Sequence, residues 1–176
     1  MLNETPADDC QAIEALVARF LQAFSQTPDA PVDLGILHSL CLPQALMVKC
    51  VGAERQVYDL ASFIAPREAL LNGGGISGFR EYPLEGRTDV FGQIAQHLCS
   101  YEKSWLAGGQ ARQGRGVKTF QLVRMNDGWK ISAMAWDDER EHLVCDVEGK
   151  LPLPVPVRFS KESGCVYNGR PDPTRR

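Results

Sequence analysis

Several features that would point to a partner or a compartment are missing from the sequence. No run of lysine or arginine is longer than the final Arg175-Arg176, and the formal net charge is −3, so the electrostatic signature of a nucleic-acid-binding protein is lacking. No apolar stretch approaches the roughly 20 residues needed to cross a bilayer. The acidic start of the chain also lacks the basic-then-apolar order of a signal peptide. We therefore expect a cytoplasmic protein that binds neither nucleic acid nor membrane.

Cysteine and histidine are present, but their spacing matches no metal-binding or disulfide pattern. The six cysteines are scattered and include no C-x-x-C pair, and the two nearest histidines, His97 and His142, are 45 positions apart. Without a secretory signal, we interpret the cysteines as reduced thiols. The sequence therefore predicts no metal site and no cofactor.

Apolar periodicity predicts helices in the first half of the chain. Thr5-Pro6 is a helix start signal, and the apolar residues from Ile13 to Phe24 then repeat at helical spacing. Asp33 and Asp59 are the expected caps of two further helices, and Pro66 is expected to kink or split the last one. Residues 45–59 between these helices resemble a short β-hairpin.

Strand patterns replace helical ones from Gly78 onward. Two extended runs, broken near Glu85-Gly86 or near Val90 to Gly92, precede a third, which the turn 126–128 joins to a fourth. Strands of ten or more residues in one meander predict a strongly twisted and curved sheet. Helices followed by an antiparallel sheet define the α+β class.

The chain is expected to divide into a domain and an arm. Residues 1–145 contain the predicted helices and strands, whereas residues 146–176 begin with "KLPLPVPV", an alternation that favours an extended conformation. Two interpretations of this C-terminal arm remain open. It lies along the domain surface or is partly disordered, or it reaches a second subunit or closes the mouth of a pocket.

The segment "NDGWKISAMAWDDER" (126–140) has apolar residues on both faces of its predicted strand. Simple alternation places Trp129 and Ile131 on one face, and Met134 and Trp136 on the other. One face is expected to cover the helices and a pocket. The other is expected to pack on the same sheet of a second subunit, which predicts a homodimer through the outer sheet face. One tryptophan would then belong to the core or pocket, and the other to this interface or to a surface covered by the C-terminal arm.

Three segments of the second half resemble the nuclear-transport-factor-2-like superfamily, close to its SnoaL-like and lumazine-binding branches. They are "IAQHLCSYE" (94–102), "GRGVKTFQLVRMNDGWKI" (114–131) and "AWDDER" (135–140). The resemblance covers roughly residues 8–140 and implies a cystatin-like α+β barrel, a cone whose curved antiparallel sheet wraps around N-terminal helices and a pocket. Isomerases, dehydratases, epoxide hydrolases, cyclases and transport adaptors share this fold, so it carries little functional information.

Candidate site residues follow from the expected pocket. His97 and Tyr101 share one strand face with Lys103; on the concave side, they would supply a general base and a hydrogen-bond donor to a developing oxyanion. Otherwise His97 is a partly exposed strand residue and Tyr101 a core aromatic. The carboxylates available to such a site are Asp89, Glu102, Asp137 and Asp138. Asp137 is the catalytic candidate among them, together with His97 and Tyr101. The residues expected to bind a ligand are Phe20, Phe63, Tyr101, Arg115, Trp129 and Trp136.

Two functional hypotheses follow. The first is a protein with an apolar pocket for a small molecule and no established catalysis. The second is an acid/base enzyme of isomerase, dehydratase or cyclase type that uses His97, Tyr101 and a nearby carboxylate. The first is favoured because no catalytic motif of the superfamily can be matched residue by residue, and a protein-binding adaptor ranks third.

Overall fold

The structure is a computed structural model and describes residues 6–145; the C-terminal arm predicted for residues 146–176 lies outside them. Helical elements precede and interrupt the first strands: α1 (Pro6–Gln22), the 3-10 helix η1 (Leu34–Ile36), α2 (Leu37–Leu40) and α3 (Leu60–Asn72). The strands are β1 (Cys41–Lys49), β2 (Gln56–Tyr58), β3 (Ile76–Phe91), β4 (Ile94–Ala107), β5 (Gln110–Met125) and β6 (Gly128–Asp138). No described helix is both long and apolar enough to cross a membrane.

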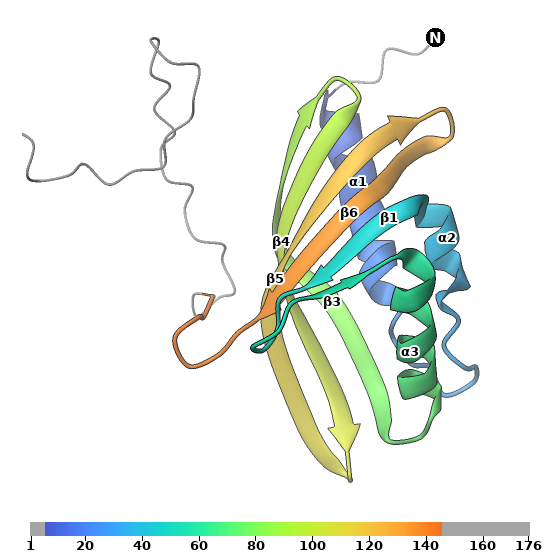
Figure 1. Ribbon diagram of the computed structural model, residues 1–176, viewed down its shortest axis with the longest axis vertical. Coiled ribbons are helices and arrows are strands. Elements are labelled where there is room, and N and C mark those ends of the chain that lie inside the picture. The colour runs from blue at the N-terminus through green and yellow to red at the C-terminus, as the bar shows by residue number, and fades with distance from the viewer. Residues whose placement is uncertain (1–5, 146–176) are drawn as a thin grey trace, which may run out of the picture.

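The six strands form one curved, unclosed sheet in the order β2-β1-β6-β5-β4-β3. The helices lie on its concave side (Figure 1). The predicted α+β class and cone-like architecture are confirmed. The sheet is mixed, however, because β1 pairs in parallel with β6 while all other neighbours are antiparallel. This parallel pair is possible because the long connection through α3 and the meander returns the chain to β1 in the same direction.

The long strands predicted for the second half are present, with 16 residues in β3, 14 in β4 and 16 in β5. The turn between β3 and β4 falls at Gly92, whose φ of +58° suits glycine. The other expected break, at Glu85-Gly86, lies inside β3 as a register shift between Pro83 and Gly86. Such irregularities bend a strand and increase the curvature of the sheet.

A second register shift explains the two apolar faces predicted for β6. Ala133 pairs with Gln121, but Ile131 pairs with Leu122, so Ser132 is an extra residue in the ladder. A one-residue insertion reverses the alternation of side chains. Trp129 and Trp136 therefore point to the same side, and both belong to the buried core. The expectation that one of these tryptophans faces a subunit interface is wrong.

Capping residues place the helices as the sequence predicts. Asp33 accepts a hydrogen bond from the Gly35 amide at the start of η1, and Asp59 accepts one from the Ser62 amide at the start of α3. Helix α3 continues through Pro66 and is not split. Pro66 and Ser62 are both exposed, so water can satisfy the Ser62 carbonyl that proline leaves without a partner.

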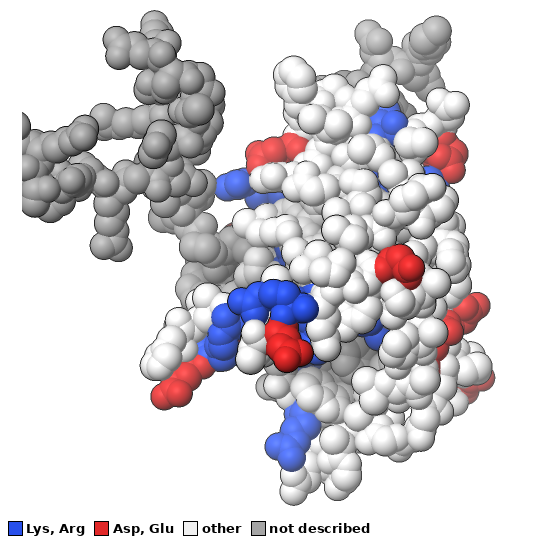
Figure 2. All heavy atoms as spheres, viewed as in Figure 1, with Lys and Arg blue, Asp and Glu red and all other residues white. Residues whose placement is uncertain are grey.

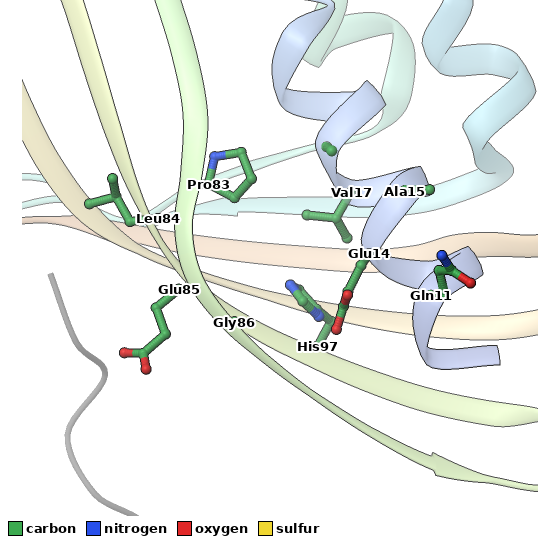
Figure 3. A pocket seen from close by; sticks show the side chains of 10 residues that line it. Gln11, Glu14, Ala15, Val17, Pro83, Leu84, Glu85, Gly86 and His97 are labelled. Atoms are coloured by element: carbon green, nitrogen blue, oxygen red, sulfur yellow. The ribbon is translucent and has the colours of Figure 1, made fainter. Parts of the chain in front are cut away.

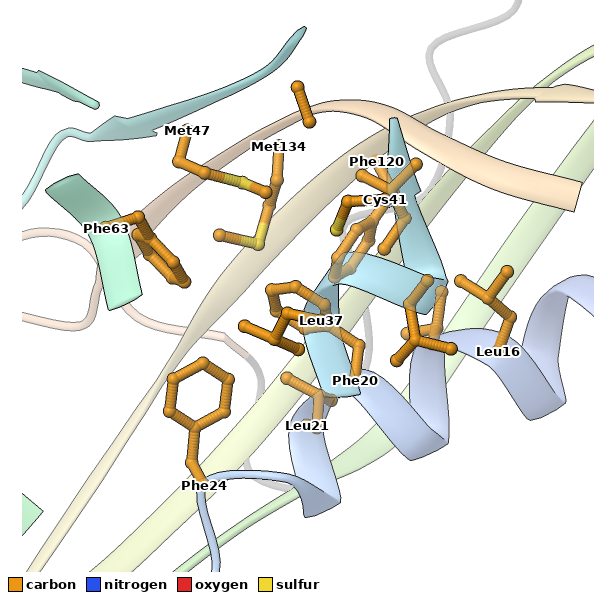
Figure 4. Close-up of a cluster of buried hydrophobic side chains, with 14 of the residues drawn as sticks. Leu16, Phe20, Leu21, Phe24, Leu37, Cys41, Met47, Phe63, Phe120 and Met134 are labelled. Carbon is orange, nitrogen blue, oxygen red and sulfur yellow. The ribbon is translucent and has the colours of Figure 1, made fainter. Parts of the chain in front are cut away.

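The core lies between the apolar face of α1 and the concave face of the sheet (Figure 4). Phe20 of α1 is its centre, since its ring contacts those of Phe24, Phe63 and Phe120 at centroid distances of 5.6 to 6.4 Å. These aromatic contacts join α1 to α3 and β5.

Candidate functional site

A cavity of about 320 Å³ opens on the concave side of the sheet, beside α3 and the end of α1. Aromatic side chains form much of its wall: Phe20, Phe24, Phe63, Phe79 and Trp136. Six charged side chains also line it: Lys49, Arg67, Glu81, Lys103, Lys118 and Asp138. An apolar cavity with a few converging polar groups is the usual form of a small-molecule site.

Arg67 of α3 is stacked among the aromatic residues of this cavity. Its guanidinium carbon lies 3.8 Å from the centroid of the Phe63 ring and 5.3 Å from that of Trp136. Its Nη1 donates a hydrogen bond to the Phe63 carbonyl at 2.8 Å. Burial lowers the pKa of Arg67, and interaction with Tyr58 opposes that effect. Arginine nevertheless keeps its charge in proteins, so the cavity contains a fixed cation.

Glu81 of β3 and Lys118 of β5 form an ion pair deep inside the cone. Glu81 Oε1 lies 3.1 Å from Lys118 Nζ, and less than a tenth of either side chain is exposed. Lys118 Nζ also lies 4.0 Å from the centroid of the Tyr101 ring, a cation–π contact. Taking two charges out of water is costly, so a buried pair is rarely present for stability alone.

A second charged group surrounds the Asp138 carboxylate at the end of β6. Tyr101 donates its phenolic hydrogen to Asp138 Oδ1, and Lys103 Nζ donates to Oδ2 at 2.6 Å. Burial and the bond to Asp138 raise the pKa of Tyr101 well above its usual value. Burial likewise raises the pKa of the neighbouring Cys99 thiol to about 12. Tyr101 is therefore a neutral hydrogen-bond donor, and Cys99 is not a thiolate nucleophile.

The residues predicted to bind a ligand fall in different places. Phe20, Phe63 and Trp136 line the cavity, and Tyr101 is in contact with its lining residue Asp138. Trp129 lies at the other end of β6, where its indole donates to Asp9 of α1. Arg115 is on the opposite face of the sheet from Tyr101, and its side chain pairs with Glu102 at 2.8 Å.

The three catalytic candidates are not brought together. Asp137 points away from the cavity and pairs with Arg140 at 2.7 Å, and its neighbour Asp138 contacts Tyr101 instead. His97 is buried on the concave face but lines a separate groove of about 600 Å³. In that groove, between α1 and β3, Glu14 and His97 face the same space (Figure 3). His97 Nδ1 is 2.8 Å from Thr88 Oγ1, and burial lowers the pKa of the imidazole.

Of the six charged residues that line the cavity, sequence reasoning named Lys103 and Asp138 and missed Lys49, Arg67, Glu81 and Lys118. Lys118 alternates with Phe120 and Leu122 on the buried face of β5, and Glu81 is the inward residue of an otherwise exposed stretch of β3. The alternation of β5 was the available signal, because a lysine in phase with two buried apolar residues points inward. Lys49 is likewise in phase with Ala45 and Met47 on β1, whereas Arg67 carried no such signal, because it follows a proline in α3.

Surface charge on the face shown in Figure 2 is interspersed, with no continuous basic area. Within residues 6–145, no group of three or more histidine, cysteine, aspartate or glutamate side chains is arranged to hold a metal ion. Four positively charged side chains instead gather in the cavity: Lys49, Arg67, Lys103 and Lys118.

Comparison with known proteins gives the fold. No protein-family model matches the sequence, and neither does any curated protein. A nuclear-transport-factor-2-like superfamily protein from Salmonella enterica superimposes with a TM-score of 0.65 at 14% identity, covering 81% of this chain and 99% of that one. A protein of this type from Silicibacter pomeroyi, of unknown function, gives 0.55 at 18% identity, with 77% and 100% covered.

A third solved structure agrees with the predicted architecture. It is a nuclear-transport-factor-2-like protein with a cystatin-like fold from Novosphingobium aromaticivorans, with a TM-score of 0.51 at 14% identity and coverage of 74% and 82%. The predicted resemblance is therefore confirmed at the level of the fold.

Proposed function

We propose that this protein, which has the nuclear-transport-factor-2-like fold, binds a small organic molecule in the cavity beside α3. The observation that supports the proposal is the cavity itself, about 320 Å³ with aromatic walls and the buried Glu81–Lys118 pair. Charged groups withdrawn from water in an apolar concavity are typical of functional sites. The aromatic wall of Phe63 and Trp136 supplies apolar area for a ring or a chain.

Thermal-shift screening of a metabolite set tests this proposal, because a ligand stabilises the folded state by RT ln(1 + [L]/Kd). Tryptophan fluorescence then locates each hit. Trp105 packs on the lining residue Phe79 and is therefore replaced first by phenylalanine. A ligand in the cavity is expected to change the emission of Trp105→Phe, but not that of Trp105→Phe with Trp136→Phe. Stabilising ligands whose fluorescence change persists in the double variant would place binding elsewhere and contradict the proposal.

A second candidate function is acid/base catalysis of the isomerase, dehydratase or cyclase type. The contact of Tyr101 with Asp138 favours it, because Asp138 lines the cavity and can act as a general base, while the fully buried phenol behind it already donates its one hydrogen to this carboxylate. Lys103 holds the same carboxylate. His97 takes no part in this arrangement, because it lines the other groove.

Catalysis is tested by incubating the protein with a metabolite extract and following changes in composition by mass spectrometry. Turnover by the wild type that is reduced about a hundredfold or more in Asp138→Asn is expected for an enzyme. Ligand binding with no change in any metabolite supports binding without catalysis. Equal turnover by Asp138→Asn would exclude Asp138 from the chemistry.

We also propose a homodimer through the outer sheet face. Four apolar residues that are only partly buried lie on the convex side of the central strands: Val48, Leu98, Val117 and Ala135. Light scattering is expected to give the mass of a dimer, and Leu98→Glu that of a monomer, while Ile36→Glu on the helical side keeps the dimer. A wild-type monomer at micromolar concentration contradicts this proposal.

The reduced cysteines support a cytoplasmic location. The five cysteines among the described residues are free thiols, and both Cys41 and Cys99 are buried. Alkylation after denaturation without a reductant is expected to modify every cysteine of protein isolated from cells. A disulfide in that sample would argue for an oxidising compartment.

A further inference from the structure

We propose that the cavity beside α3 selects an organic anion, whose acid group binds Arg67 and Lys49 and whose apolar body packs on Trp136. This inference rests on the proposed ligand-binding function and specifies its ligand class. Three observations support it: both carboxylates that line the cavity are paired with lysines, Arg67 and Lys49 are left without a carboxylate, and both of these cations are partly buried.

The charges that line the cavity do not balance. Four cationic side chains face it against two carboxylates, a formal excess of two positive charges in a chain whose net charge is −3. Each carboxylate already has a lysine: Glu81 is 3.1 Å from Lys118, and Asp138 is 2.6 Å from Lys103. The excess is therefore located on Arg67 and Lys49, neither of which pairs with a carboxylate within residues 6–145.

Arg67 is held in a way that leaves much of its hydrogen-bonding capacity for a ligand. Its guanidinium carbon lies 3.8 Å from the centroid of the Phe63 ring, and its partners within residues 6–145 are the Phe63 carbonyl and the Tyr58 side chain. A guanidinium has five N–H donors in one plane and binds a carboxylate or phosphate through two of them. Stacking fixes this plane before the ligand arrives, so little side-chain entropy is lost on binding.

Lys49 lines the cavity beside Trp136. It is the last residue of β1 and pairs in register with Trp136, and its inward phase follows that of the buried Met47 two residues earlier. Trp136 is thus next to both cations, since its ring centroid is also 5.3 Å from the Arg67 guanidinium carbon. An aromatic or aliphatic body on the indole would place its acid group near both.

Electrostatics favour an anion over the alternatives. A partly buried cation without a carboxylate partner has lost hydration that ring contacts and one carbonyl bond replace only in part, and an incoming carboxylate, phosphate or sulfonate supplies a charged partner. A cationic ligand finds both carboxylates already bonded to lysines. A neutral ligand fills the aromatic wall but leaves the excess charge uncompensated.

Three ligands of nearly equal shape test the inference by calorimetry with the full chain: 1-naphthoate, 1-naphthamide and 1-naphthylmethylammonium. We expect 1-naphthoate to bind at least about tenfold more tightly than 1-naphthamide, the size of one charge-assisted hydrogen bond. We expect the ammonium compound to bind more weakly than either. Raising the salt concentration is expected to weaken the binding of 1-naphthoate alone.

Variants assign the selectivity to the two cations. Arg67→Met keeps an apolar stem and is expected to reduce 1-naphthoate binding to the level of 1-naphthamide. Lys49→Met is also expected to weaken the binding of 1-naphthoate, and this variant provides the test if Arg67→Met fails to fold. Arg112→Met, at an exposed arginine that bonds to Gln110 in the β4–β5 hairpin, is the matched control and is expected to bind like the wild type.

The outcomes separate the inference from the function on which it rests. Equal binding of 1-naphthoate and 1-naphthamide overturns the selection of anions and leaves the ligand-binding function in place. Preference for the ammonium compound does the same. If none of the three binds while the thermal-shift screen yields only neutral ligands, the inference fails alone; if that screen also yields no ligand, both fail.

Discussion

Tyr101 on β4 reaches Asp138 on β6 across the intervening strand β5, because the residue between them is Gly116. In the strand register Tyr101 pairs with Gly116, and Gly116 pairs with Asp138. A Cβ atom at Gly116 would lie 2.7 Å from the Tyr101 hydroxyl oxygen and 2.3 Å from the Asp137 carbonyl oxygen. The missing side chain thus lets the phenol lie over β5 and donate to the carboxylate, which connects three strands at the edge of the cavity.

The Tyr101–Asp138 bond is expected to stabilise the folded protein at neutral pH and to lose this effect at alkaline pH. The pKa of Tyr101 is raised in the folded state, so its contribution is complete below the unfolded value near 10 and is lost as pH rises above it. Tyr101→Phe is expected to be about 1–2 kcal/mol less stable at pH 7. Above pH 10 this difference should shrink, by at most about 1.4 kcal/mol per pH unit.

Urea unfolding of both proteins between pH 7 and 11 measures this effect. The buried thiols Cys41 and Cys99, whose pKa values are raised to about 12, also contribute at alkaline pH, but they are common to both proteins and cancel in the difference. A difference that stays constant up to pH 11 would show that Tyr101 ionises as readily in the folded as in the unfolded state.

Removing one partner of the Glu81–Lys118 pair is expected to lower the free energy of unfolding strongly, whereas replacing both partners is expected to change it little. Lys118→Met leaves a buried carboxylate without its cation and should lower the free energy of unfolding by about 3–5 kcal/mol. Adding Glu81→Gln removes the stranded charge and should restore most of that loss. Arg87→Met is the matched control: it breaks an exposed pair with Asp89 and should change stability by less than about 1 kcal/mol.

Chemical denaturation of the single and double variants provides this comparison. If Lys118→Met is as mild as Arg87→Met, Glu81 must reach water or take up a proton at little cost, and the pair is not effectively buried.

Periodicity and turn residues were enough to predict most of the fold. The apolar stripe of α1, the caps Asp33 and Asp59, and the glycine at the β5–β6 turn are local signals, and each has the predicted outcome. The insertion of Ser132 in β6 was not predictable in this way, because a bulge is defined by the partner strand and not by its own residues. Alternation without the bulge places Trp129 and Trp136 on opposite faces, and a dimer interface was inferred from that.

Prediction of the site residues depends even more on the register between strands. Asp137 and Asp138 are adjacent and chemically alike, and only the pairing of β6 with β5 decides that Asp138 faces Tyr101. Arg115 and Lys118 on β5 lie three positions apart and therefore on opposite faces of the sheet, and there the alternation of Lys118 with buried apolar residues was enough to indicate the inward side chain. Residue type and spacing identify the strand that carries the site, but the contacts between strands decide which side chains enter it.

Gly116→Ala is expected to disrupt the edge of the cavity, whereas Gly114→Ala should be tolerated. At Gly116 the new methyl group would meet a backbone carbonyl, which cannot move without shifting β6, so we expect a loss of roughly 1–3 kcal/mol or more. At Gly114 the nearest atom is the Lys103 Cε at 2.9 Å, the far end of a flexible side chain. Equal melting temperatures for the two variants would contradict the close packing of Tyr101 over β5.

His97 is expected to weaken the fold on the acid side of neutrality. Burial lowers its pKa in the folded state, so as pH falls below about 6.5 the unfolded chain takes up the proton first and stability decreases. Thr88 faces its Nδ1, and the acids that line the same groove are Glu14 of α1 and Glu85 of β3. His97→Asn, which retains a polar group near Thr88, is expected to show a smaller decrease between pH 6.5 and 5.

Urea unfolding at pH 5, 6 and 7 gives the comparison, with His38→Asn, at an exposed histidine of α2, as the matched control for the loss of an imidazole. The variant and the wild type should differ in the slope of stability against pH, since the substitution removes one proton uptake on unfolding. Identical slopes would mean that Glu14 and Glu85 stabilise the protonated ring enough to cancel the cost of burial. His97 would then take up a proton at the same pH in the folded and the unfolded chain, and its burial would not reduce stability at acid pH.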